Sequence, residues 1–159
     1  MRRVKVVAHL AATSIALALS FASAAGAGAS GDAAVGYWLT DTRDGIVEIR
    51  SCGAELCGYV HTILVVPEPG KPLVDGYNED TRLRSRPLCG LPVLGKLQRV
   101  SADTWGNGWV YDPHAGKTYD VQVTVTKPDV LSILGYLGVK LLGQTVVWTR
   151  ANSSFAKCQ

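Results

Sequence analysis

The feature that most constrains the fold is a strict alternation of apolar and polar residues from position 119 to 126. One face of the extended chain carries only apolar side chains, and the other carries acidic, amide and hydroxyl groups. The apolar face comprises Tyr119, Val121, Val123 and Val125. A period of two over this length predicts a β-strand with one buried and one solvated face.

An aromatic strand precedes this one and predicts a hairpin. Aromatic and β-branched residues lie between Trp105 and Tyr111, and turn-forming residues follow at 112–116. Pro113 fixes its φ angle, and Gly116 can adopt a positive φ, so the chain can reverse direction there. We therefore expect the segment 105–119 to form an antiparallel hairpin.

Similar short apolar runs occupy most of the remaining chain. Proline and glycine interrupt them between 67 and 92, which predicts a long loop with room for one helical turn. The other strands are expected at 35–40, 46–52, 57–66, 93–100, 130–142 (with a turn) and 144–150. About eight short strands and no long helix predict an all-β antiparallel barrel, closed so that no strand edge is exposed.

The N-terminus has the pattern of an export signal. Arg2, Arg3 and Lys5 precede an apolar run at 6–22, followed by Ala-x-Ala sites. We interpret residues 1–29 as a cleaved signal peptide and 30–159 as a single barrel domain that is periplasmic or secreted. A membrane anchor is the alternative, but the run is at or below the roughly 17–25 residues that a spanning helix needs. The arginine pair keeps twin-arginine export open as a minor option.

Removing the first 29 residues also removes three of the 16 Lys and Arg residues and none of the 13 Asp and Glu residues. The remainder is neutral, with 13 charges of each sign. This balance gives no indication of a nucleic-acid partner or of an anionic membrane surface. The most apolar part of the remainder, at 130–142, is too short to be a transmembrane segment.

All four cysteines lie after the signal segment, and an even number in an oxidising compartment suggests two disulfides. Three pairings are possible. We favour Cys52–Cys57, because these residues enclose a short glycine-containing loop between two strands, which leaves Cys89–Cys158. Zinc is not expected, because there is no Cys-x-x-Cys pair.

Two short motifs are similar to a feature of lipocalins. In those proteins a first-strand Trp lies at the closed end of the barrel, and an Arg of the last strand packs over it. Here the corresponding residues are Trp38, in Gly36-x-Trp38, and Arg150. Such a cation–π contact contributes about 0.5–2 kcal/mol.

The chain as a whole resembles the exported bacterial domain-of-unknown-function family 2147. The matching pieces are Gly36-x-Trp38, Cys52–Gly58, Leu83–Pro92, Gly108–Tyr119 and Trp148–Arg150. The resemblance implies an eight-stranded lipocalin-like (calycin-type) barrel with no established enzymatic activity. Family members often carry a Cys in the segment that is 137–143 here, so Cys89 and Cys158 are candidates for a substitute bridge.

The sequence predicts neither an enzyme nor a cofactor. His61 and His114 have possible carboxylate partners, but no spacing places an acid and a base on one substrate atom, and no catalytic motif occurs. The oxygens of Asp75–Asp80 fall at intervals that differ from those of a calcium loop, so no metal is expected.

The long loop carries Arg82, Arg84 and Arg86 at alternate positions. On a strand they would point the same way and could engage a phosphate or carboxylate headgroup. The alternative is that acidic residues of the same loop pair with them and fix its conformation. These acidic residues are Asp75, Glu79 and Asp80.

Two classes of function fit this barrel. In the first, a cavity holds an apolar or amphipathic, lipid-like molecule, with the arginines near its anionic head and the segment 130–142 as an apolar lip. Its candidate lining residues are Trp38, Tyr59, Ile63, Trp109, Tyr111, Tyr119, Val121, Val123 and Trp148. In the second, a packed, ligand-free barrel acts as an interaction or inhibitor module of the cell envelope. The interior volume discriminates between them, because aromatic residues also commonly fill a core.

Overall fold

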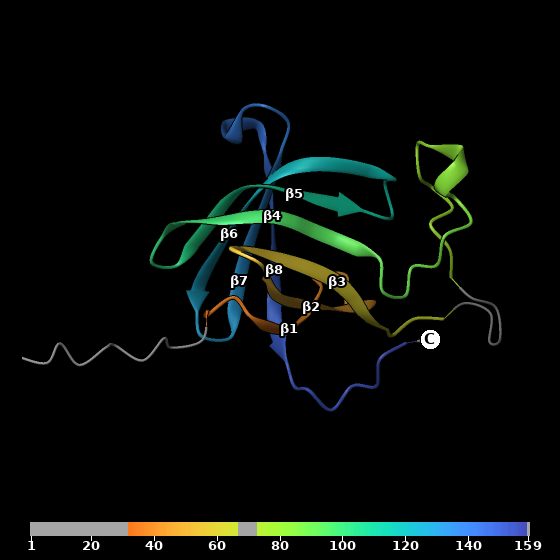
Figure 1. The fold of residues 1–159 in the computed structure, drawn as a ribbon, viewed down its shortest axis with the longest axis horizontal. Helices are drawn as coiled ribbons and strands as arrows, with labels where there is room; N and C mark the ends of the chain where they lie inside the picture. Colours follow the sequence, from red (N-terminus) through yellow and green to blue (C-terminus); the bar gives the residue numbers. More distant parts are fainter. Residues whose placement is uncertain (1–31, 67–72, 159) are drawn as a thin grey trace, which may run out of the picture.

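The computed structural model describes residues 32–66 and 73–158, which form one closed barrel of eight antiparallel strands (Figure 1). Each strand pairs with its neighbours in the sequence, and β1 pairs with β8 to close the barrel. The strands are β1 (Gly36–Leu39), β2 (Gly45–Cys52), β3 (Glu55–Ile63), β4 (Pro92–Ser101), β5 (Thr104–Asp112), β6 (Lys117–Lys127), β7 (Val130–Tyr136) and β8 (Gln144–Ala151). The expected fold class, including the long loop between the third and fourth strands, is confirmed.

Two 3-10 turns interrupt the connections. The first, η1 (Thr81–Leu83), lies in the β3–β4 loop, where one helical turn was possible. The second, η2 (Lys140–Leu142), lies between β7 and β8. The segment 130–142 was expected to contain a strand and a turn, and it does: β7 ends at Tyr136, and the apolar residues after it form a loop that includes η2.

Several register irregularities occur in the sheet, and those in β3 and β5 matter for the site. In β3, His61 is an extra residue between Val60 and Thr62, which pair with consecutive residues of β2. In β5, one extra residue lies between Trp105 and Gly108 opposite β6, where Asn107 has a φ of 58°. Each bulge shifts the alternation of inward and outward side chains by one position.

The barrel has a closed end, where the N-terminal segment enters and β8 ends. Trp38 is fully buried there, and the guanidinium of Arg150 lies 4.1 Å from its ring. Arg150 also donates hydrogen bonds to the carbonyls of Ala33, Val35 and Pro128. This is the arrangement that the lipocalin resemblance implies, and it fastens the N-terminal segment and the β6–β7 turn over the end of the core.

A packed apolar core fills this half of the interior. It combines large side chains from every strand with Trp105, over which Arg99 lies at 4.6 Å. Its members include Trp38, Ile49, Leu56, Leu97, Trp105, Val121, Val123 and Leu131. Val121 and Val123 are fully buried, as the alternation in their strand predicts.

Both disulfides follow the pairing that the sequence favours. Cys52–Cys57 closes the β2–β3 hairpin, with its Cα atoms 5.9 Å apart. Cys89–Cys158 joins the β3–β4 loop to the C-terminal tail across 69 residues. The tail also donates a backbone hydrogen bond from Cys158 to His61, so the loop, the tail and β3 are held together.

The predicted signal peptide at 1–29 lies outside the described residues. Within the described ranges, no helix has the length and apolar character required to cross a membrane.

Candidate ligand cavity

The other end of the barrel, here called the open end, contains a cavity of about 830 Å³. The β1–β2, β3–β4, β5–β6 and β7–β8 connections surround it. Its wall within the barrel consists mainly of valine and other aliphatic side chains, which are Ile46, Val47, Val60, Ile63, Val93, Val110, Ile133 and Val146. Because the interior of an eight-stranded barrel is just wide enough for large side chains to fill, a ring of short valines leaves space.

The β3–β4 loop supplies the outer wall of this cavity. Leu73, Val74, Tyr77 and Leu88 face it from the loop. The loop is attached to the hairpin of β5 and β6 by a backbone hydrogen bond from Glu79 to the carbonyl of Gly116. The cavity therefore depends on how firmly this loop is held against the barrel.

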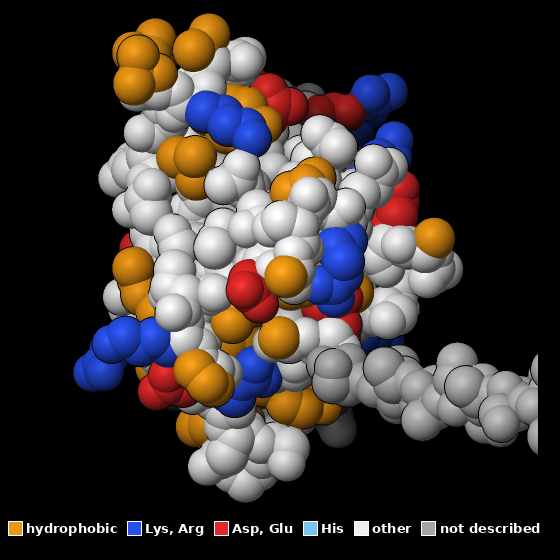
Figure 2. All heavy atoms as spheres, turned by 90° about the vertical axis from the view of Figure 1, so that its left-hand side faces the viewer, with side chains coloured by type: hydrophobic (Ala, Val, Ile, Leu, Met, Phe, Trp, Pro, Cys, Tyr) orange, Lys and Arg blue, Asp and Glu red, His pale blue; other side chains and the backbone are white. Residues whose placement is uncertain are grey.

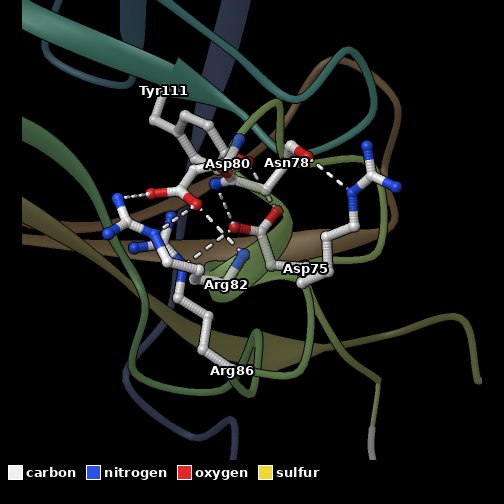
Figure 3. A network of polar contacts seen from close by, with 7 residues as sticks. Asp75, Asn78, Asp80, Arg82, Arg86 and Tyr111 are labelled. Carbon is white, nitrogen blue, oxygen red and sulfur yellow. Dashed lines mark hydrogen bonds and ion pairs between the residues drawn. The ribbon is translucent and has the colours of Figure 1, made fainter.

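A buried polar network holds the loop in place (Figure 3). Asp75, which is 1% exposed, accepts hydrogen bonds from the Tyr111 hydroxyl at 2.5 Å, from Asn78 at 2.7 Å and from Arg86 Nε at 2.8 Å. Asn78 also donates to the Tyr111 hydroxyl at 2.9 Å. All members of this set are partnered, so a charge that would be costly to bury alone is stabilised by three donors.

The electrostatics of this network keep Tyr111 protonated. Burial raises the pKa of Tyr111, and the hydrogen bond to Asp75 and its negative charge raise it further, against smaller opposing effects of Asn78 and Arg86. The hydroxyl is therefore a lasting donor to Asp75 at neutral pH. Its ring also contacts the guanidinium of Arg86 at 5.3 Å, and the residue lines the cavity.

The three arginines of the loop have partners within the loop. They lie on η1 and the turn after it, so their alternate spacing does not point them the same way. Arg82 makes a two-pronged pair with Asp80, and Arg84 donates to the carbonyl of Asn78. Arg86 binds Asp75, and none of the three lines the cavity. Pairing within the loop accounts for Arg82 and Arg86; Glu79 instead lies 3.8 Å from Lys117.

The rim of the cavity is acidic. The β1–β2 turn places Asp41 and Asp44 there, and the end of β5 and the turn after it place Asp112 and His114 there. His114 Nε2 lies 2.7 Å from Asp44 Oδ2, a contact that joins the two turns across the cavity mouth.

Asp44 is held in its charged form by this contact and by its own turn. Partial burial raises its pKa, but hydrogen bonds from Thr42 and Thr40 and the charge and hydrogen bond of His114 outweigh that effect, so the pKa lies below 3.8. A carboxyl group whose pKa is lowered by folding stabilises the folded state above its unfolded pKa. This contribution is lost as the pH falls through the folded pKa.

We therefore expect acid to loosen the cavity mouth. The unfolding free energy should decline as the pH falls from about 4 through the folded pKa of Asp44, and Asp44→Asn should remove that part of the decline. Urea denaturation at a series of pH values measures it. The control is Asp129→Asn, an exposed residue in the β6–β7 turn at the closed end. Identical pH profiles for the two variants would contradict the assignment.

Comparison with known proteins places the chain in a family. A family model described as "Uncharacterized protein conserved in bacteria (DUF2147)" matches residues 36–150. The chain belongs to this family. The DUF2147 chain is also similar to a solved structure, that of protein HP1028 from Helicobacter pylori, which is described as belonging to the lipocalin family. The TM-score is 0.64 at 23% identity, over 75% of this chain and 83% of HP1028. No curated protein matches it.

The likeness to HP1028 shows the fold of the DUF2147 chain. Among the described residues, no three His, Cys, Asp or Glu side chains are grouped as metal ligands.

The cavity of the DUF2147 chain includes four of the predicted lining residues. These are Ile63, Tyr111, Tyr119 and Trp148. Trp38, Val121 and Val123 belong to the packed core of the closed end. Tyr59 lies outside the cavity wall beneath Arg50, at 4.4 Å, and Trp109 packs across Gly95 on the outer side of the sheet.

Sequence reasoning missed the valine lining of the DUF2147 cavity. Val47, Val60, Val93 and Val110 carry no sign of a site beyond the usual alternation of a strand. The acidic rim was also missed, because Asp44 and His114 are 70 residues apart and meet only when the barrel closes.

Proposed function

We propose that this DUF2147 protein is an exported binding protein that holds an apolar or amphipathic small molecule in the open half of its barrel. The observation that carries the proposal is the aliphatic cavity of about 830 Å³. Small-molecule sites are typically apolar cavities of about 300–1,000 Å³ with a few polar groups. The signal-like N-terminus and the two disulfides support export.

The rim indicates which headgroup such a ligand carries. The apolar body would lie among the valines, and its head would lie near Asp41, Asp44 and Asp112. Among the described residues, Asp44 has a partner there in His114, and the arginines of the loop are engaged elsewhere. A carboxylate head would meet like charge, so a neutral or cationic head is favoured over a fatty acid.

A displacement series tests both parts of the proposal. The neutral fluorescent probe N-phenyl-1-naphthylamine is titrated into delipidated protein, and dodecylamine, dodecanol and laurate then compete with it at neutral pH. These competitors share one chain length and differ in head charge. We expect saturable probe binding, and displacement by the amine at concentrations at least about tenfold lower than by laurate, equivalent to about 1.4 kcal/mol. Equal or better displacement by laurate would reject the rim argument.

Two tryptophan substitutions locate the probe. Val110→Trp places a large side chain in the cavity and should abolish probe binding. Val100→Trp adds the same side chain at an exposed position on β4 and should leave binding unchanged. An absence of saturable binding in the wild type would favour the interaction-module alternative. That alternative assumes a packed barrel, whereas the open half of this one is hollow.

A further inference from the structure

The loop between β7 and β8 exposes an unusual group of aliphatic side chains, here called the apolar tip. It comprises Leu137, Val139, Leu141 and Leu142, which are 70%, 57%, 91% and 84% exposed. The loop projects from the top of the barrel in Figure 1, and Figure 2 shows hydrophobic side chains gathered at that upper end. Single exposed leucines are ordinary, but four large aliphatic residues within six positions mark an interaction site.

The conformation of this loop is fixed by its polar groups. Lys140 Nζ donates to Gln122 Oε1 on β6 at 2.7 Å, and the Gly138 N–H donates to Asp120 Oδ2 at 3.2 Å. Backbone hydrogen bonds close the turn at 139–143. The polar groups are thus directed towards the barrel wall while the aliphatic side chains are directed away from it. Water favours the opposite orientation, so this arrangement fits an apolar environment at the tip.

The base of the tip has the chemistry of a membrane interface. Tyr136 lies directly before the tip, and Lys140 Nζ lies 5.8 Å from its ring. Tyrosine is enriched at the level of lipid headgroups, and lysine extends its charge to that level while its stem remains in apolar surroundings. In a bilayer the apolar core is followed outwards by the headgroups. The exposed aliphatic side chains would lie in the core, and Tyr136 and Lys140 would lie at the level of the headgroups.

The tip is too small for a typical protein partner. A stable protein interface involves about 20–30 residues on each side and a matching extended surface. Here the exposed aliphatic residues form a projecting loop of a few residues. Such a shape suits shallow insertion, in which apolar groups enter about 5–10 Å into the boundary between headgroups and acyl chains.

We propose that the apolar tip docks this protein on a lipid bilayer by inserting into the acyl-chain boundary. Because residues 30–159 are neutral overall, docking is driven by apolar burial and not by anionic lipid. Docking also brings the cavity to the lipid. A hollow lined by Leu137 and Leu142 shares Tyr119, Gly135 and Gln144 with the main cavity. Passage of a ligand along this route rests on the proposed function, whereas docking itself does not.

The direct test is a tryptophan reporter in the tip. Leu141→Trp protein with both disulfides formed is mixed with vesicles of phosphatidylcholine, with and without phosphatidylglycerol. We expect a blue shift of its emission and quenching by bromine-labelled lipid, with both vesicle types and at high salt. Vesicle binding only with phosphatidylglycerol and only at low salt would overturn the apolar mechanism. No shift with either vesicle would overturn docking.

A charge substitution tests whether vesicle binding depends on the apolar tip or on exposed apolar residues in general. Leu141→Asp should lower the vesicle partition coefficient by at least about tenfold in cosedimentation, because an ionised group cannot enter the acyl region cheaply. Val100→Asp, at a 51% exposed position on β4, should leave it unchanged. Equal partitioning of the two variants would reject the proposal. Sedimentation velocity gives a second outcome that would reject it. If the wild type is a dimer and Leu141→Asp dissociates it, a second copy of the protein covers the tip.

The same variants keep this test independent of ligand binding. Leu141 lines neither the main cavity nor the smaller hollow, so N-phenyl-1-naphthylamine should bind Leu141→Asp protein as it binds wild type. Loss of vesicle binding with probe binding retained supports the docking role of the tip. Probe binding that disappears together with vesicle binding would overturn the assignment of Leu141 to docking alone.

Discussion

Asp75→Ala is expected to lower the free energy of unfolding by about 3–5 kcal/mol. The Asp75 carboxylate is fully buried and accepts from Tyr111, Asn78 and Arg86, so its removal leaves three donors without their acceptor. The cavity wall should loosen as well, because these bonds hold the β3–β4 loop against β5. Urea denaturation gives the free energy, and the affinity for N-phenyl-1-naphthylamine reports on the wall.

Asp80→Ala is the matched control for this prediction. It removes an Asp–Arg pair from the same loop, but Arg82 and Asp80 have side-chain exposures of 86% and 35%. Solvent screens an exposed pair of this kind, so Asp80→Ala should cost much less than Asp75→Ala even though it also removes the side-chain cap of η1. If the two substitutions cost the same, the buried network would not be what fastens the loop.

Gly116→Ala is expected to destabilise the protein by about 2–5 kcal/mol. A Cβ atom at Gly116 would lie 1.8 Å from the carbonyl oxygen of Tyr77, and the residue has a φ of 69°. Both the backbone conformation and the contact therefore resist a side chain. Because the neighbour is backbone, the clash is relieved only if the β3–β4 loop moves off the hairpin. Thermal and chemical denaturation measure the effect.

Gly138→Ala distinguishes the cost of the backbone conformation from the cost of the contact with Tyr77. Gly138 has the same φ of 69°, but no atom lies within 4 Å of a Cβ built there. Its substitution should cost only the roughly 1–2 kcal/mol of a left-handed backbone conformation. The difference between the two variants measures the contact with Tyr77. Equal losses would mean that the loop does not press on Gly116 in solution.

The strand pattern was predictable because local signals and the final fold agree. The alternation along β6 gives the correct face for Val121 and Val123, and the turn residues at 112–116 give the correct hairpin. The disulfides followed from the position of Cys52 and Cys57 on either side of a tight turn. These features depend on residues that are neighbours in the sequence.

The faces of β3 and β5 were not predicted, because bulges change the period. The extra residue His61 allows Val60 and Ile63 both to face the cavity, while Tyr59 faces outward. The extra residue near Asn107 separates the faces of Trp105 and Trp109 in the same way. His61 carries no signal of a bulge, whereas the glycines on either side of Asn107 are such a signal, which our sequence-based prediction did not use.

The sequence also did not predict how far along the barrel axis an inward residue lies. Val121 and Val110 are both inward valines, yet Val121 is packed in the core and Val110 lines the cavity. The two valines differ in the size of the side chains that face them from other strands. Which side chains face each valine depends on the register of the strands, and a single strand's sequence does not reveal that register. For the same reason the partners of Arg82, Arg84 and Arg86 depended on a loop conformation that a strand-like spacing did not reveal.

The division of the interior into a filled and a hollow half separates the residues that maintain the fold from those that line the cavity. A larger side chain at Val110 or Val60 enters open space, whereas the same change at Val121 meets packed atoms on every side. The hollow half can therefore accept new shapes with little loss of stability. This barrel is thus suited to diversification: a single scaffold can acquire different specificities one substitution at a time while its closed end stays constant.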